Sequence, residues 1–196
     1  MNYYLNMEEM LKNLPKNKKI LLHSCCAPCS SHVITLLKDY FDITILYYNP
    51  NIAPYEEYEL RKKEQIRLLK ELDSHIKFYD CDYDNDIFEK AVKDLHQEKE
   101  GGRRCRVCFA LRLAKTAQLA AENHFDYFGT TLTVSPHKNA KVINEIGKNM
   151  EEKYHIPFLY SDFKKKEGYK KSIELSKKYE LYRQDYCGCI YSKRGN

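Results

Sequence analysis

The segment Lys19-Ile20-Leu21-Leu22-His23-Ser24 contains three consecutive large apolar residues and is typical of a buried strand. Residues 31–40 follow it with apolar side chains in helical phase, so a helix is expected next. The turn between them is Cys25-Cys26-Ala27-Pro28-Cys29. A strand followed at once by a helix is the first part of a crossover to a parallel neighbour. The sequence therefore indicates an α/β protein.

The alternation of strand and helix continues along the chain. Further strands are predicted at 43–48, 76–79, 127–134 and 157–160. Further helices are predicted around 66–72 and at 86–96, 107–122 and 142–150. We expect a doubly wound, mostly parallel five-stranded sheet, Rossmann-like, with helices on both faces. Ligands of such sheets bind beyond the carboxyl ends of the strands, where the strand order reverses.

The length of 196 residues favours a single domain spanning 1–196. Within it we expect an α/β core at 19–163 and a C-terminal helical and loop extension at 164–196. This extension is basic and rich in tyrosine, with ten Lys or Arg against four acids. Lysines suit phosphates and tyrosines suit stacked bases, so the extension is a candidate RNA-contacting surface. A solvated basic helix explains the same composition.

The absence of long apolar runs and the number of cysteines indicate the compartment in which the protein works. No apolar run is long enough to cross a bilayer, and the first residues do not resemble a secretion signal, so we expect a cytoplasmic protein without membrane association. The chain has eight cysteines. Because cytosolic thiols are kept reduced, these cysteines point to metal binding or redox chemistry rather than to a disulfide framework.

Four cysteines are the main candidates for a metal site: Cys25, Cys26, Cys105 and Cys108. The Cys105-Arg-Val-Cys108 spacing directs two thiolates at one metal, and arginines beside it favour the charged form. Zinc and an iron–sulfur cluster both accept four thiolates, and the adjacent pair favours a cluster with ligands on separate irons. The alternative is that cysteines of this chain serve only as small buried hydrophobic residues. This alternative fits Cys81 well, and Cys29 is a second candidate for it.

A separate pair, Cys187-Gly188-Cys189, lies near the C-terminus. Cysteines one residue apart close a disulfide only with strain, and strained disulfides are the labile kind used in redox catalysis. The pair is therefore a candidate redox-active dithiol. Further metal ligation or an unstructured tail are the alternatives.

The motifs, taken in order, resemble the QueH family of cobalamin-independent epoxyqueuosine reductases. The resemblance covers about residues 19–192. It is carried by His23-Ser-Cys-Cys-Ala-Pro-Cys-Ser30, Tyr48-Asn-Pro-Asn-Ile52, Arg104-Cys-Arg-Val-Cys-Phe109, Thr130-Thr-Leu-Thr-Val-Ser-Pro-His-Lys138 and Tyr186-Cys-Gly-Cys189.

The resemblance implies reduction of epoxyqueuosine to queuosine at the wobble position of tRNA, the last step of queuosine synthesis. By motif, Cys25, Cys26, Cys105 and Cys108 would hold a [4Fe-4S] cluster without cobalamin, and Cys187 with Cys189 would be the redox pair. The electron donor and the oligomeric state are not implied. The family also implies an additional metal ion beside the cluster. Its candidate ligands are Cys29, Asp80, Asp82 and Glu57.

Several polar residues near the expected strand ends are candidates for substrate contact. Tyr47, Tyr48 and Asn51 lie where a base would stack or be read, and the Thr131, His137 and Lys138 region would meet ribose or phosphate. Proton donation is a candidate role for His23 and His137, although a histidine at such a place is more often structural.

Two other functions fit an α/β chain of this kind. One is an ATP-dependent tRNA-thiolating enzyme, which needs a phosphate loop after the first strand. Here that turn lacks glycine, and Pro28 removes a backbone donor. The other is a zinc-stapled RNA-binding module without catalysis.

Overall fold

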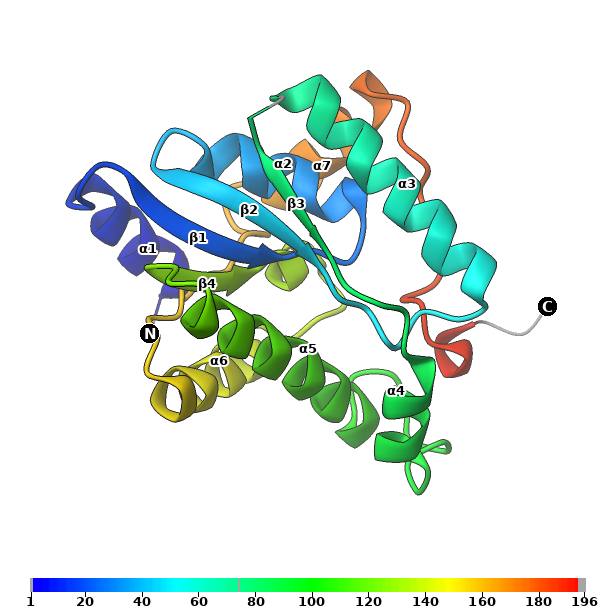
Figure 1. Cartoon of the computed structure of the whole chain (residues 1–196). Helices are drawn as coiled ribbons and strands as arrows, with labels where there is room; N and C mark the ends of the chain where they lie inside the picture. The colour runs from blue at the N-terminus through cyan, green and yellow to red at the C-terminus, as the bar shows by residue number, and fades with distance from the viewer. Residues whose placement is uncertain (1, 74, 194–196) are drawn as a thin grey trace.

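A four-stranded parallel sheet forms the centre of the computed structural model, which describes residues 2–73 and 75–193. The strands are β1 (Lys18–His23), β2 (Phe41–Tyr47), β3 (Lys77–Asp80) and β4 (Tyr127–Thr130) (Figure 1). Their order is β3-β2-β1-β4, and every neighbouring pair is parallel. The strand order reverses between β1 and β4. The predicted α/β class with a parallel sheet is confirmed.

Helices cover both faces of the sheet (Figure 1). Their bounds are α1 (Tyr3–Lys12), α2 (Ala27–Leu37), α3 (Tyr55–Leu72), α4 (Asn85–Val92), α5 (Arg103–Glu122), α6 (Ala140–Tyr154) and α7 (Gly168–Lys178), with two short 3-10 helices, η1 (Thr131–Val134) and η2 (Ile190–Ser192). α2 and α3 lie on one face, and α5 and α6 lie on the other.

The alternating side chains of β1 divide the core between the two faces. Ile20 and Leu22 pack in a cluster with Val33 of α2, whereas Leu21 packs with Leu113 of α5. All three β1 side chains are fully buried. Each contributes about 1.5–3 kcal/mol of transfer free energy, so both faces fix the end of β1 from which the site is built.

The sheet has one strand fewer than predicted. Residues 157–160 form only an isolated parallel bridge between Phe128 and Phe158. The predicted fourth strand is also too long, because Thr130 accepts a hydrogen bond from Leu132 N at 3.2 Å and caps η1. α1 was not predicted.

Two helices begin about four residues earlier than predicted. α2 starts at Ala27 because Pro28 is tolerated in a first turn, where its missing N–H has no helical partner. α5 starts at Arg103, so Cys105 and Cys108 lie on one helix. Both cysteine motifs thus occupy helix N-termini.

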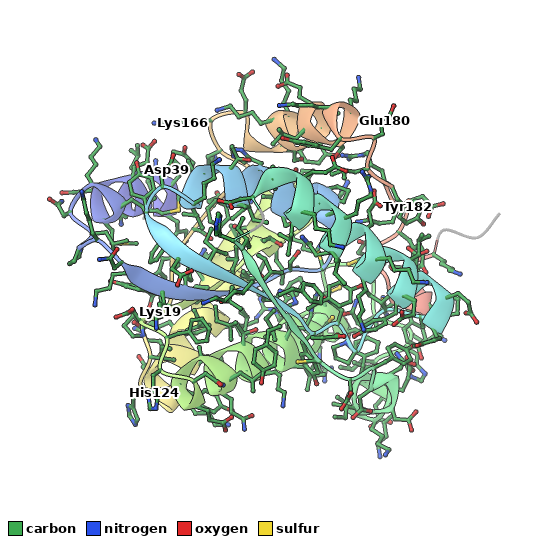
Figure 2. All side chains as sticks on the ribbon, turned by 45° about the horizontal axis from the view of Figure 1, so that its top comes forward. Lys19, Asp39, His124, Lys166, Glu180 and Tyr182 are labelled. Carbon is green, nitrogen blue, oxygen red and sulfur yellow. The ribbon has the colours of Figure 1, made fainter. Side chains whose placement is uncertain are left out.

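The C-terminal segment returns to the cysteines. α7 packs on α2, and Figure 2 places Lys166 and Glu180 near its two ends. The chain then runs back along α3, where Glu64 accepts from Tyr182 N at 2.8 Å. Residues 194–196 of the predicted extension, including Arg194, lie outside the described residues. No helix in the described part of the chain has the length and apolar character needed to cross a bilayer.

Candidate metal and redox site

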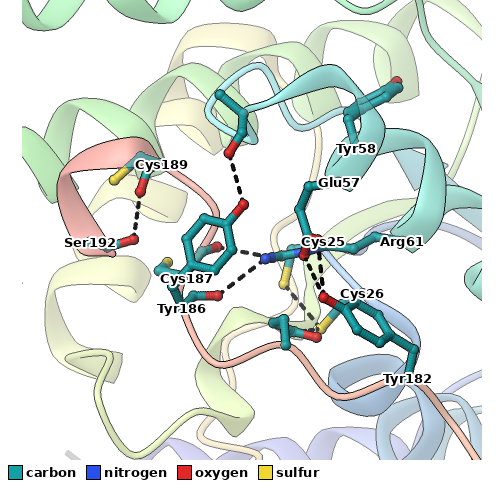
Figure 3. Close-up of polar contacts among 12 residues, drawn as sticks. Cys25, Cys26, Glu57, Tyr58, Arg61, Tyr182, Tyr186, Cys187, Cys189 and Ser192 are labelled. Atoms are coloured by element: carbon teal, nitrogen blue, oxygen red, sulfur yellow. Dashed lines mark hydrogen bonds and ion pairs between the residues drawn. The ribbon is translucent and has the colours of Figure 1, made fainter. Parts of the chain in front are cut away.

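Three cysteines meet at the carboxyl end of β1. The sulfur atoms of Cys25, Cys26 and Cys29 all lie within 4.8 Å of one another, and the first two are 3.8 Å apart (Figure 3). Cys26 is the N-cap of α2, and Cys29 lies in its first turn. The positive end of a helix stabilises a thiolate, so this position suits cysteines that bind a metal.

Buried polar contacts hold the turn that carries these cysteines. Gln65 of α3 accepts hydrogen bonds from Ser24 Oγ at 2.7 Å and from Ser30 Oγ at 2.9 Å. Asn49 Nδ2 donates to the Ser24 carbonyl at 2.8 Å. These contacts fix the backbone on both sides of the triad and leave the three sulfurs to converge.

The three thiols share their protons unequally. Hydrogen bonds with Cys26 and then Cys29 lower the pKa of Cys25 well below its usual range, with help from the cations Lys138 and Arg112. The same hydrogen bond with Cys25 raises the pKa of Cys26 to about 12. Among the three cysteines of the triad, Cys25 therefore loses its proton most readily.

The second cysteine motif lies beside the C-terminal pair. Cys108 of α5 and Cys189 belong to one buried cluster with Phe88 and Val92 of α4. Burial raises the pKa of Cys108 to about 12, although the nearby cation of Arg112 acts in the opposite direction. The structure thus brings the predicted redox pair next to the Cys105 and Cys108 motif.

Arg61 of α3 positions this tail (Figure 3). Its side chain is 1% exposed and donates to the carbonyls of Cys187 and Tyr186, each at 3.2 Å. Glu57 orients the guanidinium through a 2.6 Å contact and also accepts from Tyr182. The strap made of residues 182–189, hereafter the tail strap, is therefore tied to α3 rather than loose.

A cavity of about 180 Å³ lies between the tail strap and the triad. Cys29, Cys187, His137 and Lys138 are among its lining residues. Burial alone would lower the pKa of Lys138, but its electrostatic interaction with the nearby sulfur atoms, first Cys187 and then Cys25, raises it above its ordinary value. A charged ammonium group thus stands on the wall of a cavity edged by two cysteines.

The other predicted substrate contacts lie away from the cavity wall. Tyr48, Asn51 and Thr131 are buried and are not among its lining residues. His23 is fully buried between Thr130 Oγ1 at 3.0 Å and Asn49 Oδ1 at 3.2 Å. Burial lowers the pKa of His23 to about 4, which keeps the ring neutral and gives it a structural place.

The candidate ligands for an additional metal differ in their surroundings. Cys29 joins the triad. Glu57 is paired with Arg61, and Asp80 forms an ion pair with Lys62 at 2.6 Å. Asp82 is exposed. Among the described residues, only Cys25, Cys26 and Cys29 form a group of three or more potential ligands, so Cys29 has the strongest geometric support.

Arg112, like Arg61, belongs to the site but was not predicted from the sequence. Its side chain is buried, Nε donates to the Cys108 carbonyl at 3.2 Å, and Nη1 and Nη2 have no hydrogen-bond partner in the described part of the chain. The signal was present, since Arg112 follows Cys105 and Cys108 at the seven- and four-residue spacing of one helix face. A buried cation without a partner is costly unless an anion completes it.

The residues present therefore fit an anionic metal–thiolate centre. Cysteine sulfur is a soft ligand that selects zinc or iron–sulfur clusters. A centre with several thiolates carries the negative charge that the buried guanidinium of Arg112 lacks among the described residues, and it suits the nearby ammonium of Lys138.

Comparison with known proteins identifies the family. The sequence model described as "Epoxyqueuosine reductase QueH" matches residues 20–195. The chain belongs to the QueH family. The resemblance predicted from the motifs is confirmed.

Individual members of the family align with this chain over most of its length. QueH from Streptococcus pyogenes serotype M1 is 42% identical, covering 98% of this chain and 78% of its own. QueH from Thermotoga maritima is 37% identical, covering 88% and 89%. A structure titled as a predicted subunit of tRNA methyltransferase from Methanocaldococcus jannaschii has a TM-score of 0.53 at 16% identity, covering 79% of this chain and 76% of its own. This last likeness shows the α/β fold alone.

Proposed function

We propose that this QueH protein reduces epoxyqueuosine in tRNA to queuosine, in the cytoplasm and without membrane attachment. The observation that carries the proposal is the tail strap, which holds Cys187 at the cavity that also contains Cys29. Membership of a family of reductases named for this substrate supports the same reaction.

The Cys187 and Cys189 pair supplies the electrons and protons that the reaction consumes. Removing the epoxide oxygen breaks two C–O bonds, forms the C=C bond of the product and consumes two electrons and two protons. Oxidation of the two thiols to a disulfide releases two electrons and two protons. The products are the alkene, water and the Cys187–Cys189 disulfide. A reductant of the dithiol or iron–sulfur class then restores the thiols.

We assign Cys25, Cys26, Cys105 and Cys108 to a [4Fe-4S] cluster and Cys29 to an additional metal ion, with no part for cobalamin. The soft donor group of Cys25, Cys26 and Cys29, and the guanidinium of Arg112, whose Nη1 and Nη2 have no hydrogen-bond partner among the described residues, support an anionic centre here. When bound, such a centre supplies electron transfer and Lewis acidity.

The chain's own residues perform the remaining tasks. Arg61 and Glu57 hold the tail strap at the cavity. Lys138 stabilises the negative charge that develops on the departing oxygen, since its charged ammonium stands on the cavity wall. His137, exposed at the rim, contacts the nucleotide. The substrate base leaves its stack to reach the cavity, as bases do in other enzymes that modify them.

One experiment tests the proposal. The protein is purified anaerobically, its absorption spectrum is recorded and iron and acid-labile sulfide are counted. It is then incubated with a reductant and tRNA carrying epoxyqueuosine, and the nucleosides are analysed by mass spectrometry. Conversion to queuosine is expected. Unchanged epoxyqueuosine would refute the reaction, and zinc without sulfide would refute the cluster.

A further inference from the structure

A second hollow adjoins the cavity at the start of α6. It is an open groove of about 750 Å³ with four lysines on its walls. We call it the lysine groove, lined by Lys138, Lys141, Lys164 and Lys165. Asp162 is the only acidic residue among its lining residues, and it pairs with Lys164 at 2.7 Å.

The positive charges of the other groove lysines are not neutralised by close carboxylates of the described residues. Lys141 approaches Glu145 only at 4.0 Å, and its side chain is 75% exposed. The ammonium groups of Lys138 and Lys165 form no ion pair with any residue in 2–73 or 75–193. Four cations against one anion leave the groove with a formal charge of +3. A groove of this charge attracts a polyanion.

The groove and the cavity share a wall. Pro136, His137 and Lys138 line both hollows, so a ligand can lie in the groove and extend across this wall toward Cys29 and Cys187. The shared wall joins η1 to α6, and Asn139 caps α6 by accepting from Lys141 N at 3.0 Å. A capped helix start gives the wall a defined shape.

We propose that the lysine groove binds the RNA backbone next to the modified nucleotide. Phosphates of the anticodon loop lie along Lys141, Lys164 and Lys165, while the nucleotide turned out of the loop crosses His137 to enter the cavity. The proposal rests on the proposed function, since it takes tRNA as the substrate. It fits the general pattern in which lysines hold the backbone of a single strand and a pocket holds one extruded base.

The other basic surface of the chain is less suited to this task. The lysines of α7 line neither the groove nor the cavity. Lys170 pairs with Glu167, and Lys166 pairs with Glu8 on α1. Within the predicted RNA-contacting segment 164–196, Lys164 and Lys165 line the groove, together with Lys138 and Lys141 from the core.

The test compares two double variants with matched loss of charge. K141A/K165A removes two exposed lysines of the groove, and K177A/K178A removes two exposed lysines of α7. Binding of a fluorescent RNA hairpin with an anticodon-sized loop and unmodified guanosine is measured by anisotropy at several salt concentrations. Melting curves check that both variants fold.

Removal of the groove lysines should weaken binding about tenfold and reduce the slope of log affinity against log salt by about 1.4, or about 0.7 for each phosphate that a lysine no longer neutralises. The α7 variant should match the unaltered protein in both respects. An equal loss in the two variants, or no loss in the groove variant, would overturn the proposal.

Turnover separates this proposal from the proposed function. With tRNA carrying epoxyqueuosine, the groove variant should show a raised KM and an unchanged kcat. If the unaltered protein binds RNA through the groove but reduces nothing, the reaction is wrong and the groove stands. If it reduces epoxyqueuosine with the same KM in both variants, the groove is wrong and the reaction stands.

Discussion

Arg61 Nη1 donates to the carbonyl oxygen of Cys187 at 3.2 Å and so joins residues 126 positions apart in the chain. The donor lies on α3, which packs against α2, the helix that begins at the cysteine triad. The main chain of the proposed redox pair is therefore held by the same packed helices that carry the proposed metal ligands. The packing of these helices fixes the position of the tail strap.

Replacing Arg61 should release the tail strap. R61A leaves the partly buried Glu57 without its cation and two carbonyls without a donor, so we expect a loss of about 3–5 kcal/mol in the free energy of unfolding, with loss of reductase activity. R61K retains the charge but not the two-pronged donation, and should recover stability more than activity. K70A, on an exposed position of the same helix, serves as control. Urea unfolding and turnover measure both effects, and an active R61A would contradict the role of Arg61.

Gly188 has little freedom to change. Its φ is +126°, and an added Cβ would lie 2.9 Å from Ile52 Cγ1 and 3.2 Å from Asn51 Nδ2. We expect G188A to lower the free energy of unfolding by about 2–3 kcal/mol and to displace the two thiols. The matched control is G101A, where φ is +85° but no atom lies within 4 Å of the added Cβ. Equal melting temperatures for the two variants would show that contact at Gly188 is unimportant.

The two tail cysteines should be separable from the metal site. C187S and C189S remove the dithiol, so each should abolish turnover while the absorbance of the cluster persists. C81S is the control, because Cys81 is half-buried and lies outside the triad. It should retain most of the activity. Loss of iron from C187S or C189S would instead place that cysteine among the ligands.

The fold could be predicted as far as local patterns reach. The apolar run of β1 and the alternation of strands and helices sufficed for the parallel sheet. The length of β4 was not readable, because a side-chain cap at Thr130 ends the strand within an apolar stretch. Residues 157–160 have the composition of a strand but pair only at Phe158.

The site could be predicted by its cysteines but not by its cations. Cysteines in close pairs are visible in a sequence, whereas Arg61 and Arg112 resemble ordinary charged helix positions. Their burial depends on segments distant in the chain. Arg61 donates a hydrogen bond to the Tyr186 carbonyl, and Arg112 interacts electrostatically with Cys187 and Cys25. Such meetings follow from tertiary packing, which spacing along the chain does not encode.

Asp126 gives a pH dependence that is independent of the active site. It accepts from Lys18 Nζ at 2.7 Å and from Lys19 N at 2.8 Å, and these contacts lower the pKa of its carboxyl. A lowered pKa in the folded state means that the contribution to stability is present above the ordinary value, about 3.9, and is lost as pH falls through the folded value. D126N should melt below the unaltered protein at neutral pH, and the gap should close as pH falls through the lowered pKa of the folded Asp126 carboxyl. A gap that widens in acid would contradict this sign.

Arg112 yields a prediction with opposite signs in two states of the protein. In the metal-free chain its Nη1 and Nη2 are buried without hydrogen-bond partners in residues 2–73 and 75–193, so R112M removes an uncompensated charge while preserving bulk beside Phe109. The metal-free variant should therefore be more stable, by about 1–4 kcal/mol. In the cluster-loaded protein the same change removes the cation facing the thiolates, which should lower the reduction potential of the cluster and speed its loss to a chelator. Urea unfolding of the metal-free forms, redox titration and chelation kinetics measure the three effects. R104M on the same helix is the control, because the Arg104 guanidinium already donates to the Leu95 and His96 carbonyls, so its removal should destabilise both states. A metal-free R112M that is less stable than the unaltered chain would mean that Arg112 has a partner within the protein and is not waiting for an anionic centre.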